Sequence, residues 1–233
     1  MEKKEVIIVF LMLLSNWGFA QNWQSLFNGK TLDGWAVVDK PANVQIKDSS
    51  MVLHMTPYTS RHAFVRTLEK YRDFIFEVEF RRDLILDGGV LFRSVDAPDT
   101  AFSALFGYMV KIDPQPTRLW TGGIFDDFGN TWRWMSTLEG NPTAQNALKN
   151  AGEWDTWRIE AVGNHLKIWL NGIPVSNVVN DKHREGYIAL KIHFMGNNPD
   201  NEQFSANIKN IRIQTKKVKK YAQKMDLPEQ KVD

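Results

Sequence analysis

The sequence of 233 residues contains no cysteine. Disulfide bonds and a cysteine-linked lipid are therefore excluded, and packing alone has to hold the fold together. The chain also lacks an apolar stretch of the roughly 20 residues that a membrane-spanning helix needs. A shorter apolar run at 6–14 follows Lys3 and Lys4 and precedes the small residues Gly18 and Ala20. This pattern is typical of a signal peptide over residues 1–20, so we expect cleavage near Ala20, a secreted or periplasmic protein, and no transmembrane segment in the mature chain.

A large excess of charge of one sign is absent, because the formal net charge is +2. The C-terminal tail, residues 216–233, carries six lysines against three acidic residues, which leaves residues 21–214 at a net charge of −1. Proteins that bind nucleic acid usually present a basic surface, so we expect no nucleic-acid partner. A short basic terminus is most often solvated and frayed, and we expect this of the tail; contact with an anionic surface is the alternative.

Linkers rich in proline, serine or glycine are missing too, and no segment repeats. The length of the mature chain therefore fits one large domain, which we place at residues 24–215, better than two small ones. Such a domain can bury a substantial apolar core.

Apolar and polar residues alternate along several stretches, which is the pattern of half-buried β-strands. In residues 74–81 the even-numbered positions are all apolar, and a similar alternation runs through 157–161 and 165–170. Further strands are expected at 44–46, 51–55, 89–93, 107–112, 122–125, 186–194 and 206–214.

Asn171 and Gly172 accept the positive φ angles of a type I′ turn, so residues 165–179 should form a tight hairpin. About ten short strands, separated by turns and without a long helical pattern, indicate an all-β fold. The expected fold is a jelly-roll β-sandwich of two antiparallel sheets.

A long polar segment, residues 126–153, interrupts this succession of short strands and turns, and we expect a loop with a short helix around 143–149. Such a loop is usually functional or disordered, and Trp132 and Trp134 favour function, because a disordered segment would lack these aromatic residues. Sugar rings stack their C–H faces on aromatic planes, so either tryptophan could line a cleft; a core position is the alternative. Trp120 is a further candidate for lining a sugar-binding cleft. By contrast, the expected core positions of tryptophan are Trp35, Trp154 and Trp157.

Strand parity places several polar side chains on faces that point away from the core. These residues are Arg93, Lys111, Asp113, Lys191 and His193. An ordinary solvated face is the alternative interpretation, since parity does not show whether these faces belong to one sheet. The other four histidines, at positions 54, 62, 165 and 183, are expected in ordinary surface positions.

Classical glycosidases need two carboxylates, and Asp113, Asp126 and Asp127 could supply a pair. The compact Glu-x-Asp-x-Glu signature of jelly-roll glucanases is absent, which weakens that interpretation. Nucleophile elbows, P-loops, dinucleotide fingerprints and His-Glu-x-x-His zinc motifs are absent as well.

Several longer segments together resemble the 3-keto-disaccharide hydrolase family. They read LFNGKTLDGW (26–35), DGGVLFRS (87–94), GYMVKIDP (107–114), TGGIFDD (121–127), EWDTWRIEAVGNHLKIWLNGIPV (153–175) and GYIALKIH (186–193). The resemblance extends from about Leu26 to Ile213. It implies a concanavalin A-like jelly roll that acts as a 3-keto-glucoside 1,2-lyase or a 3-keto-2-hydroxy-glucal hydratase, on sugars already oxidised at C3.

This implied chemistry has a physical basis, because a ketone at C3 acidifies the hydrogen on C2. A base can then form an enolate that expels the C1 substituent. The resemblance matches Arg93, Asp126 and His193 to residues of the family's motifs. Our hypothesis makes His193 or Asp126 the base and Arg93 or Lys111 the stabiliser of the enolate. Residues expected to bind the substrate are Trp120, Trp132, Trp134, Asp113, Lys191 and Asp127.

The sequence departs from the family's pattern at Met109, Lys111 and Asp87-Gly88. Methionine cannot ligate a hard cation, and Lys111 replaces an acceptor with a positive charge, so these residues argue against a divalent metal and the cofactor stays open. Lys111 could replace a metal, this subgroup could act on another sugar, or the protein could only bind. We therefore expect a secreted enzyme that cleaves or hydrates 3-keto-glycosides; the alternative is a non-catalytic carbohydrate-binding module.

Overall fold

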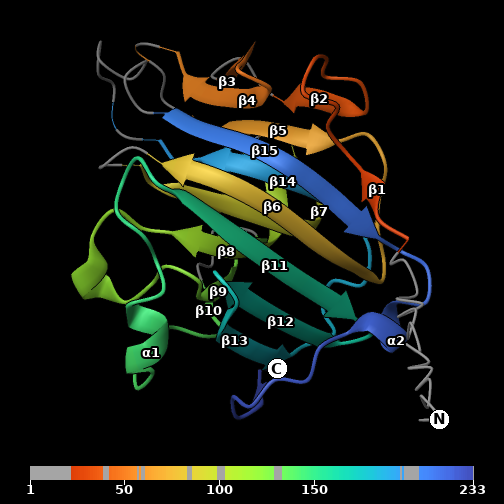
Figure 1. The fold of residues 1–233 in the computed structure, drawn as a ribbon, viewed down its shortest axis with the longest axis vertical. Helices are drawn as coiled ribbons and strands as arrows, with labels where there is room; N and C mark the ends of the chain where they lie inside the picture. The colour runs from red at the N-terminus through yellow and green to blue at the C-terminus, as the bar shows by residue number, and fades with distance from the viewer. Residues whose placement is uncertain are drawn as a thin grey trace, which may run out of the picture.

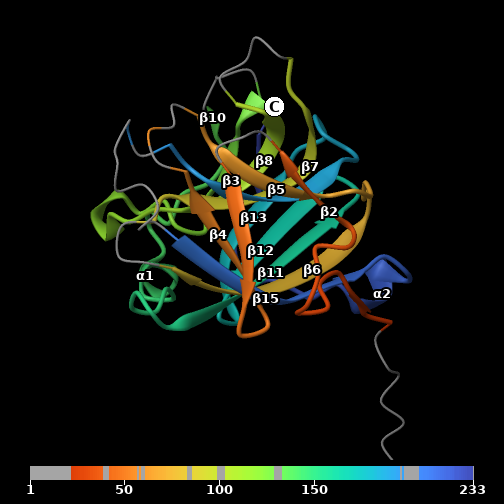
Figure 2. The same ribbon diagram turned by 90° about the horizontal axis from the view of Figure 1, so that it is seen from above.

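Two β-sheets pack face to face and form a jelly-roll β-sandwich with a concanavalin A-like architecture (Figure 1). The structure is a computed structural model. It describes residues 22–38, 42–56, 58, 61–82, 86–98, 103–128, 133–194, 196 and 205–232. Figure 2 shows the two layers from above, with β7 (Gly88–Asp96) and β8 (Leu105–Ile112) in one and β6 (Phe74–Arg82) and β15 (Ser205–Gln214) in the other.

The first sheet, sheet A, contains nine strands among the described residues. Its order is β16 (Gln230–Lys231), β13 (Ile173–Val179), β12 (His165–Leu170), β11 (Trp154–Val162), β6, β15, β4 (Ser50–Met55) and β3 (Ala42–Lys47), with β1 (Gln24–Ser25) beside β15. Its strands pair antiparallel, apart from the parallel pair of β13 and β16.

The second sheet, sheet B, contains seven strands among the same residues, and all its pairs are antiparallel. Its order is β10 (Arg133–Trp134), β9 (Ile124–Asp126), β8, β7, β14 (Tyr187–Ile192), β5 (Ala63–Thr67) and β2 (Trp35–Val38). The helices described are one turn each: a 3₁₀ turn at Pro116–Arg118, α1 at Pro142–Gln145 and α2 at Val218–Tyr221.

The main apolar core lies between the sheets, where alternate side chains of each strand point inward. Phe76 and Val78 of β6 meet Val110 of β8 and Leu190 of β14 in this core. Trp157 is fully buried there and stacks on Phe80, with ring centroids 5.6 Å apart. The inward-facing residues of β6 are the even-numbered residues of 74–81, which the alternation singled out.

The predicted strands are confirmed, although several are trimmed at their ends. The segment expected at 122–125 begins only at Ile124, and the one expected at 186–194 ends at Ile192. Asn171 and Gly172 have φ angles of 51° and 80°, which confirms the predicted turn of the β12–β13 hairpin.

The C-terminal tail is not frayed, so that expectation is wrong. Residues 221–227, which we call the C-terminal strap, run over the outer face of sheet A. Backbone carbonyls of the strap accept hydrogen bonds from Arg158, Lys167 and Asn177, which lie on three neighbouring strands. Polar side chains of the sheet thus hold the tail, and β16 then adds to the sheet edge.

Two further expectations are wrong, because the sequence does not show which neighbours cover a side chain. Trp154 is half-buried on the outer face of sheet A, whereas Trp35 and Trp157 are core residues as expected. His62 and His183, expected at the surface, are only 3% and 9% exposed. The segment 126–153 contains a short strand, β10, besides the predicted helical turn.

Within the described part of the chain, no helix is long and apolar enough to cross a membrane. The predicted signal peptide lies outside the described residues, so it stays a prediction.

Candidate functional site

A small pocket opens on the outer face of sheet B, the face that points away from sheet A. It combines charged, imidazole and aromatic side chains from four strands and a loop. The residues that line it are Lys111, Trp120, Phe125, Asp127, Trp134, Lys191 and His193. Six of these seven were singled out from the sequence, and the structure brings them together.

The two lysines converge because the strand between them carries a glycine. Gly89 of β7 pairs with Lys111 on β8 and with Lys191 on β14. A Cβ at position 89 would lie 2.1 Å from the carbonyl oxygen of Val110 and 2.8 Å from the Cε of Met109. Only glycine therefore fits at this position, and the sheet surface between the lysines stays open.

Each lysine is nearly buried and paired with its own carboxylate. Lys191 Nζ lies 2.7 Å from Asp127 Oδ2, and both side chains are under 5% exposed. Lys111 pairs with Asp87, the residue immediately before β7. Burial lowers the pKa of Lys191, and the charge of Asp127 opposes this shift. The two pairs hold two ammonium groups against the pocket in fixed positions.

His193 lies at the end of β14, next to the lysine pairs. Its backbone N–H donates to the carbonyl of Asp87 at 2.9 Å, and its ring Nδ1 lies 2.9 Å from the carbonyl of Phe194. Since a carbonyl can only accept, Nδ1 carries the proton, and the lone pair of the neutral ring is on Nε2. Burial lowers the pKa of His193; the charge of Asp87 opposes the shift and that of Lys191 adds to it. The ring is therefore neutral at neutral pH.

A second imidazole supports the first. The ring of His62 packs against His193, with centroids 4.2 Å apart, and its Nδ1 accepts the N–H of Phe194 at 2.9 Å. Burial and then the charge of Lys191 lower the pKa of His62 far below its usual range. His62 is thus a neutral ring that fixes the orientation of His193.

Aromatic rings form the opposite wall of the pocket. The rings of Trp120 and Trp134 lie 5.1 Å apart, and Phe125 packs against Trp134 at 5.2 Å. Both tryptophans are partly exposed, in line with the prediction that they line a cleft. Flat, rigid rings beside fixed charges suit a ligand that has an apolar face and polar edges.

The donor set does not suit a divalent metal. Among the described residues, no group of three or more histidine and acidic side chains could hold a metal ion. The two ammonium groups of Lys111 and Lys191 would repel a cation placed in the pocket, and Asp87 and Asp127 already neutralise them.

Arg93 lies outside the pocket, against the expectation from parity. The residue has a φ of 49° within a β-bulge of β7, and this bulge turns its side chain away from the outer face. The guanidinium is completely buried and donates to the carbonyls of Arg72 and His183 and to Asp73. Arg93 thus links sheet B to the segment that leads into β6 of sheet A.

Asp126 also lies elsewhere, because successive strand residues point to opposite faces and Asp127 occupies the pocket side. The carboxylate of Asp126 lies 3.1 Å from His183 Nε2 and pairs with Lys182. Burial opposes ionisation, but the hydrogen bonds from His183 and Lys182 lower the pKa of Asp126 overall. Asp126 and Asp127 therefore do not form a carboxylate pair, which was one of the pairs that Asp113, Asp126 and Asp127 could have supplied.

Asp113 also lies outside the pocket lining. Asp113 is buried in the turn after β8, where it accepts the N–H of Gln115 at 2.7 Å and pairs with Arg118. Trp132 lies outside the described residues.

Sequence reasoning missed three members of the site: Asp87, Phe125 and His62. Asp87 had a detectable signal, because it precedes the Gly-Gly pair at the start of a predicted strand. Phe125 shares its strand face with Asp127, so the same parity argument would have found it. For His62 the sequence offered no signal, since its contact with His193 depends on the packing of separate strands.

Comparison with solved structures supports the architecture. The chain is similar in fold to a candidate glycosyl hydrolase from Parabacteroides distasonis ATCC 8503, with a TM-score of 0.59, 14% identity, and coverage of 83% of this chain and 93% of that one. It is also similar to the carbohydrate-binding module CBM66 from Bacillus subtilis, with a TM-score of 0.56, 15% identity, and coverage of 78% and 95%. A galectin-like protein of unknown function from Bacillus subtilis has a TM-score of 0.57 at 10% identity, with coverage of 78% and 90%.

Among curated proteins, no sequence relative is found. At identities this low, the structural likenesses show the fold alone. The sequence model of one domain family, however, matches residues 22–214, which is most of the chain and includes the whole pocket. The protein is a carbohydrate-active β-sandwich, and it belongs to the family described as the 3-keto-alpha-glucoside-1,2-lyase-like domain.

Proposed function

We propose that this protein cleaves glycosides of sugars that carry a ketone at C3, by removal of the C2 proton and elimination of the C1 substituent. The observation that carries the proposal is the meeting of a neutral imidazole and two fixed ammonium groups in one pocket, opposite an aromatic wall. Family membership supports the substrate class.

In the first step, Nε2 of His193 takes the proton from C2. The electrons of the C–H bond form a C2=C3 double bond, and the ketone oxygen becomes an enolate oxygen. Lys111 and Lys191 then stabilise the developing negative charge, which fixed cations in a nearly dry site do better than water. A base in this position contributes about 10²- to 10⁴-fold to the rate.

In the second step, the enolate returns to a ketone and its electrons form a C1=C2 double bond. The bond from C1 to the leaving oxygen breaks, and that oxygen gains a proton to leave as an alcohol. Lys191 is suited to supply this proton, because burial lowers the pKa of its ammonium group. The sugar product is an unsaturated 3-keto sugar, and no water is consumed.

The neighbours of Lys111 and Lys191 suggest a different role for each lysine. Lys111 pairs with Asp87, whose backbone carbonyl also binds the N–H of His193. We therefore place the C3 oxygen at Lys111, which Asp87 links to the backbone of the base. Trp120 and Trp134 would hold the apolar face of the ring and fix its orientation.

The test uses a panel of 3-keto-glucosides with either anomeric configuration, together with matched ordinary glucosides. In deuterated solvent, we expect release of the aglycone from keto sugars and exchange of the C2 hydrogen, without turnover of ordinary glucosides. Lys111→Met should reduce both signals by about 10²-fold. Saturable binding with neither exchange nor release across the panel would show instead a carbohydrate-binding module.

A further inference from the structure

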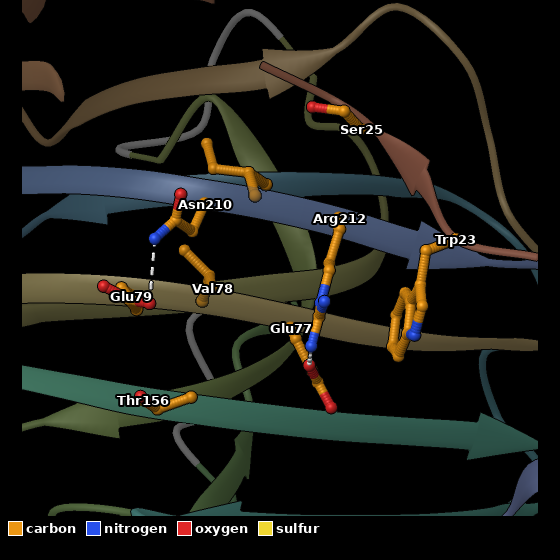
Figure 3. A pocket seen from close by; sticks show the side chains of 9 residues that line it. Trp23, Ser25, Glu77, Val78, Glu79, Thr156, Asn210 and Arg212 are labelled. Atoms are coloured by element: carbon orange, nitrogen blue, oxygen red, sulfur yellow. Dashed lines mark hydrogen bonds and ion pairs between the residues drawn. The ribbon is translucent and has the colours of Figure 1, made fainter. Parts of the chain in front are cut away.

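A second hollow lies on the opposite side of the molecule, on the outer face of sheet A. It has a volume of about 380 Å³, within the range of ligand pockets. Figure 3 shows its side chains: Glu77 and Glu79 of β6 lie beside Arg212 and Asn210 of β15, and Trp23 stands at one end. Nothing in the chemistry of the sheet B pocket uses this hollow.

A β-bulge shapes the hollow. The pairing of β15 with β6 shifts between Lys209 and Arg212, and Asn210 adopts a left-handed φ of 51°. This conformation is uncommon for residues other than glycine, and bulges of this kind redirect side chains near binding sites. The bulge directs the Asn210 amide to Glu79, with Nδ2 and Oε1 2.9 Å apart.

One tryptophan, Trp23, lines the hollow, and a second, Trp154, lies on the same face outside its lining. The ring of Trp23 covers the guanidinium of Arg212, 4.5 Å from the ring centroid. Trp154 lies on the same face, where Lys209 and Arg81 contact its ring. Glu77 and Arg81 are four residues apart on β6, so the two rings are separated by roughly 13 Å along the strand direction.

Most of the charged side chains between the rings form ion pairs, and Arg81 donates to the amide oxygen of Asn207. Glu77 pairs with Arg158 and Arg212, and Glu79 pairs with Lys209. A charged ligand would have to compete with these ion pairs at Glu77 and Glu79, whereas hydroxyl groups can add to the remaining lone pairs and N–H groups of these side chains. A neutral ligand with many hydroxyls fits this pattern better than a charged one.

The C-terminal strap leaves this region uncovered. It crosses β11, β12 and β13, where the side chains of Arg158, Lys167 and Asn177 bind it. The hollow occupies the adjacent part of the same face, over β6 and β15, and Thr156 near the start of β11 is exposed at its side. The strap therefore covers the outer face of sheet A over β11, β12 and β13 and leaves an open strip over β6 and β15.

We propose that this strip, from Trp23 past Glu77 and Glu79 to Trp154, binds a chain of a neutral polysaccharide. The rings would stack on sugar faces at two points, and the paired carboxylates and amides would bind the hydroxyls between them. This inference extends the proposed function, because a polymer held on one face would keep the protein close to the saccharides on which the sheet B pocket acts.

The experiment measures retardation of the protein in native gels that contain soluble β-glucan, α-glucan, xylan or galactomannan. We expect retardation by at least one polymer, and an affinity about tenfold lower for Trp23→Ala and for Trp154→Ala. Tyr58→Ala is the matched control, because Tyr58 is 67% exposed and lies outside the hollow. Thr156→Arg, which fills the hollow from an exposed position, should weaken binding with the fold intact.

Small 3-keto-glucosides separate this inference from the proposed function. The two tryptophan variants should turn them over at the rate of the unaltered protein, whereas Lys111→Met should lose turnover and keep its retardation. Absence of retardation by every polymer would overturn the inference, as would full retardation of the Trp23→Ala/Trp154→Ala double variant. If retardation depends on these tryptophans and no keto sugar is cleaved, the inference stands and the proposed function fails.

Discussion

Two buried polar clusters belong to sheet B, and they differ in what surrounds them. The pocket cluster comprises Lys111, Lys191, Asp87, Asp127 and His193. Its charged groups border an open space with an aromatic wall on the other side. Its ion pairs hold the ammonium groups in place and leave them beside a position where a ligand can lie.

The other cluster, which we call the clasp, comprises Arg93, Tyr108, Asp126, Asn180 and His183. Its polar groups bind one another and the backbone: the Tyr108 hydroxyl donates to Asn180 and accepts the N–H of His183. Arg93 binds two backbone carbonyls from separate segments. The clasp thus fixes the segment 180–186 against the end of the sandwich.

The comparison shows that burial and charge do not identify a functional site by themselves. Both clusters contain a histidine near a carboxylate and a buried cation. The difference is that the polar groups of the clasp hydrogen-bond one another and the backbone, whereas the polar groups of the pocket also face a space that a ligand can occupy. Substitutions in the clasp should therefore change stability, and substitutions in the pocket should change turnover.

The largest effect is expected for His193→Ala. Loss of the base should lower kcat for a 3-keto-glucoside by about 10²- to 10⁴-fold, with little change in the melting temperature. His165→Ala is the matched control, because the His165 side chain is 49% exposed and lies on β12 of sheet A, outside the pocket lining. Steady-state kinetics check the prediction, and full activity of His193→Ala would show that another group is the base.

Arg93→Ala tests whether the clasp contributes to stability and not to turnover. Removal of a completely buried cation that binds two carbonyls and Asp73 should cost about 3 kcal/mol of the free energy of unfolding. Urea denaturation measures this loss. The folded fraction should keep the kcat of the unaltered protein, and a large loss of kcat without a loss of stability would place Arg93 in catalysis after all.

Trp134→Ala tests the aromatic wall. Loss of one stacking ring should raise KM for the keto sugar by up to about tenfold and lower kcat less, because stacking holds substrate and transition state alike. Phe128→Ala serves as the control, since this exposed ring contacts His183 of the clasp. Equal changes in KM for the two variants would contradict the assignment of the wall.

The smallest effect concerns pH. His62 and His193 have lowered pKa values in the folded protein, so they bind fewer protons than in the unfolded chain. Their contribution favours folding above the unfolded pKa of about 6.5 and is lost as the pH falls below it. The melting temperature should therefore decrease between pH 6.5 and about 5.5, and a His62→Phe/His193→Phe variant should show a shallower decrease in this range.

Much of the fold could be predicted from local features of the sequence. Alternation in 74–81 determined which side chains of β6 face the core, and Asn171-Gly172 determined the hairpin. The position of Arg93 could not be predicted by the same rule, because a single bulge reverses the parity of the residue. Trp154 was placed in the core because parity gives the two faces of a strand without showing which neighbours cover them.

For the site, parity correctly placed Lys111, Lys191 and His193 on outward faces. It could not show that β8, β7 and β14 lie side by side, since strand order depends on connections between distant segments. The contact of His62 with His193 depends on this order alone, whereas Asp87 had a signal in the sequence, the Gly-Gly pair that follows it.

By itself, the sequence determined the all-β character, the absence of disulfides and the side of each regular strand that faces the core, because these depend on residue type and period. Only the tertiary structure decided that Gly89 lies between two lysines, that His62 supports His193, and that Arg93 and Asp126 belong to the clasp. Those facts depend on the register and order of strands far apart in the chain, and the packing of the whole sandwich sets both.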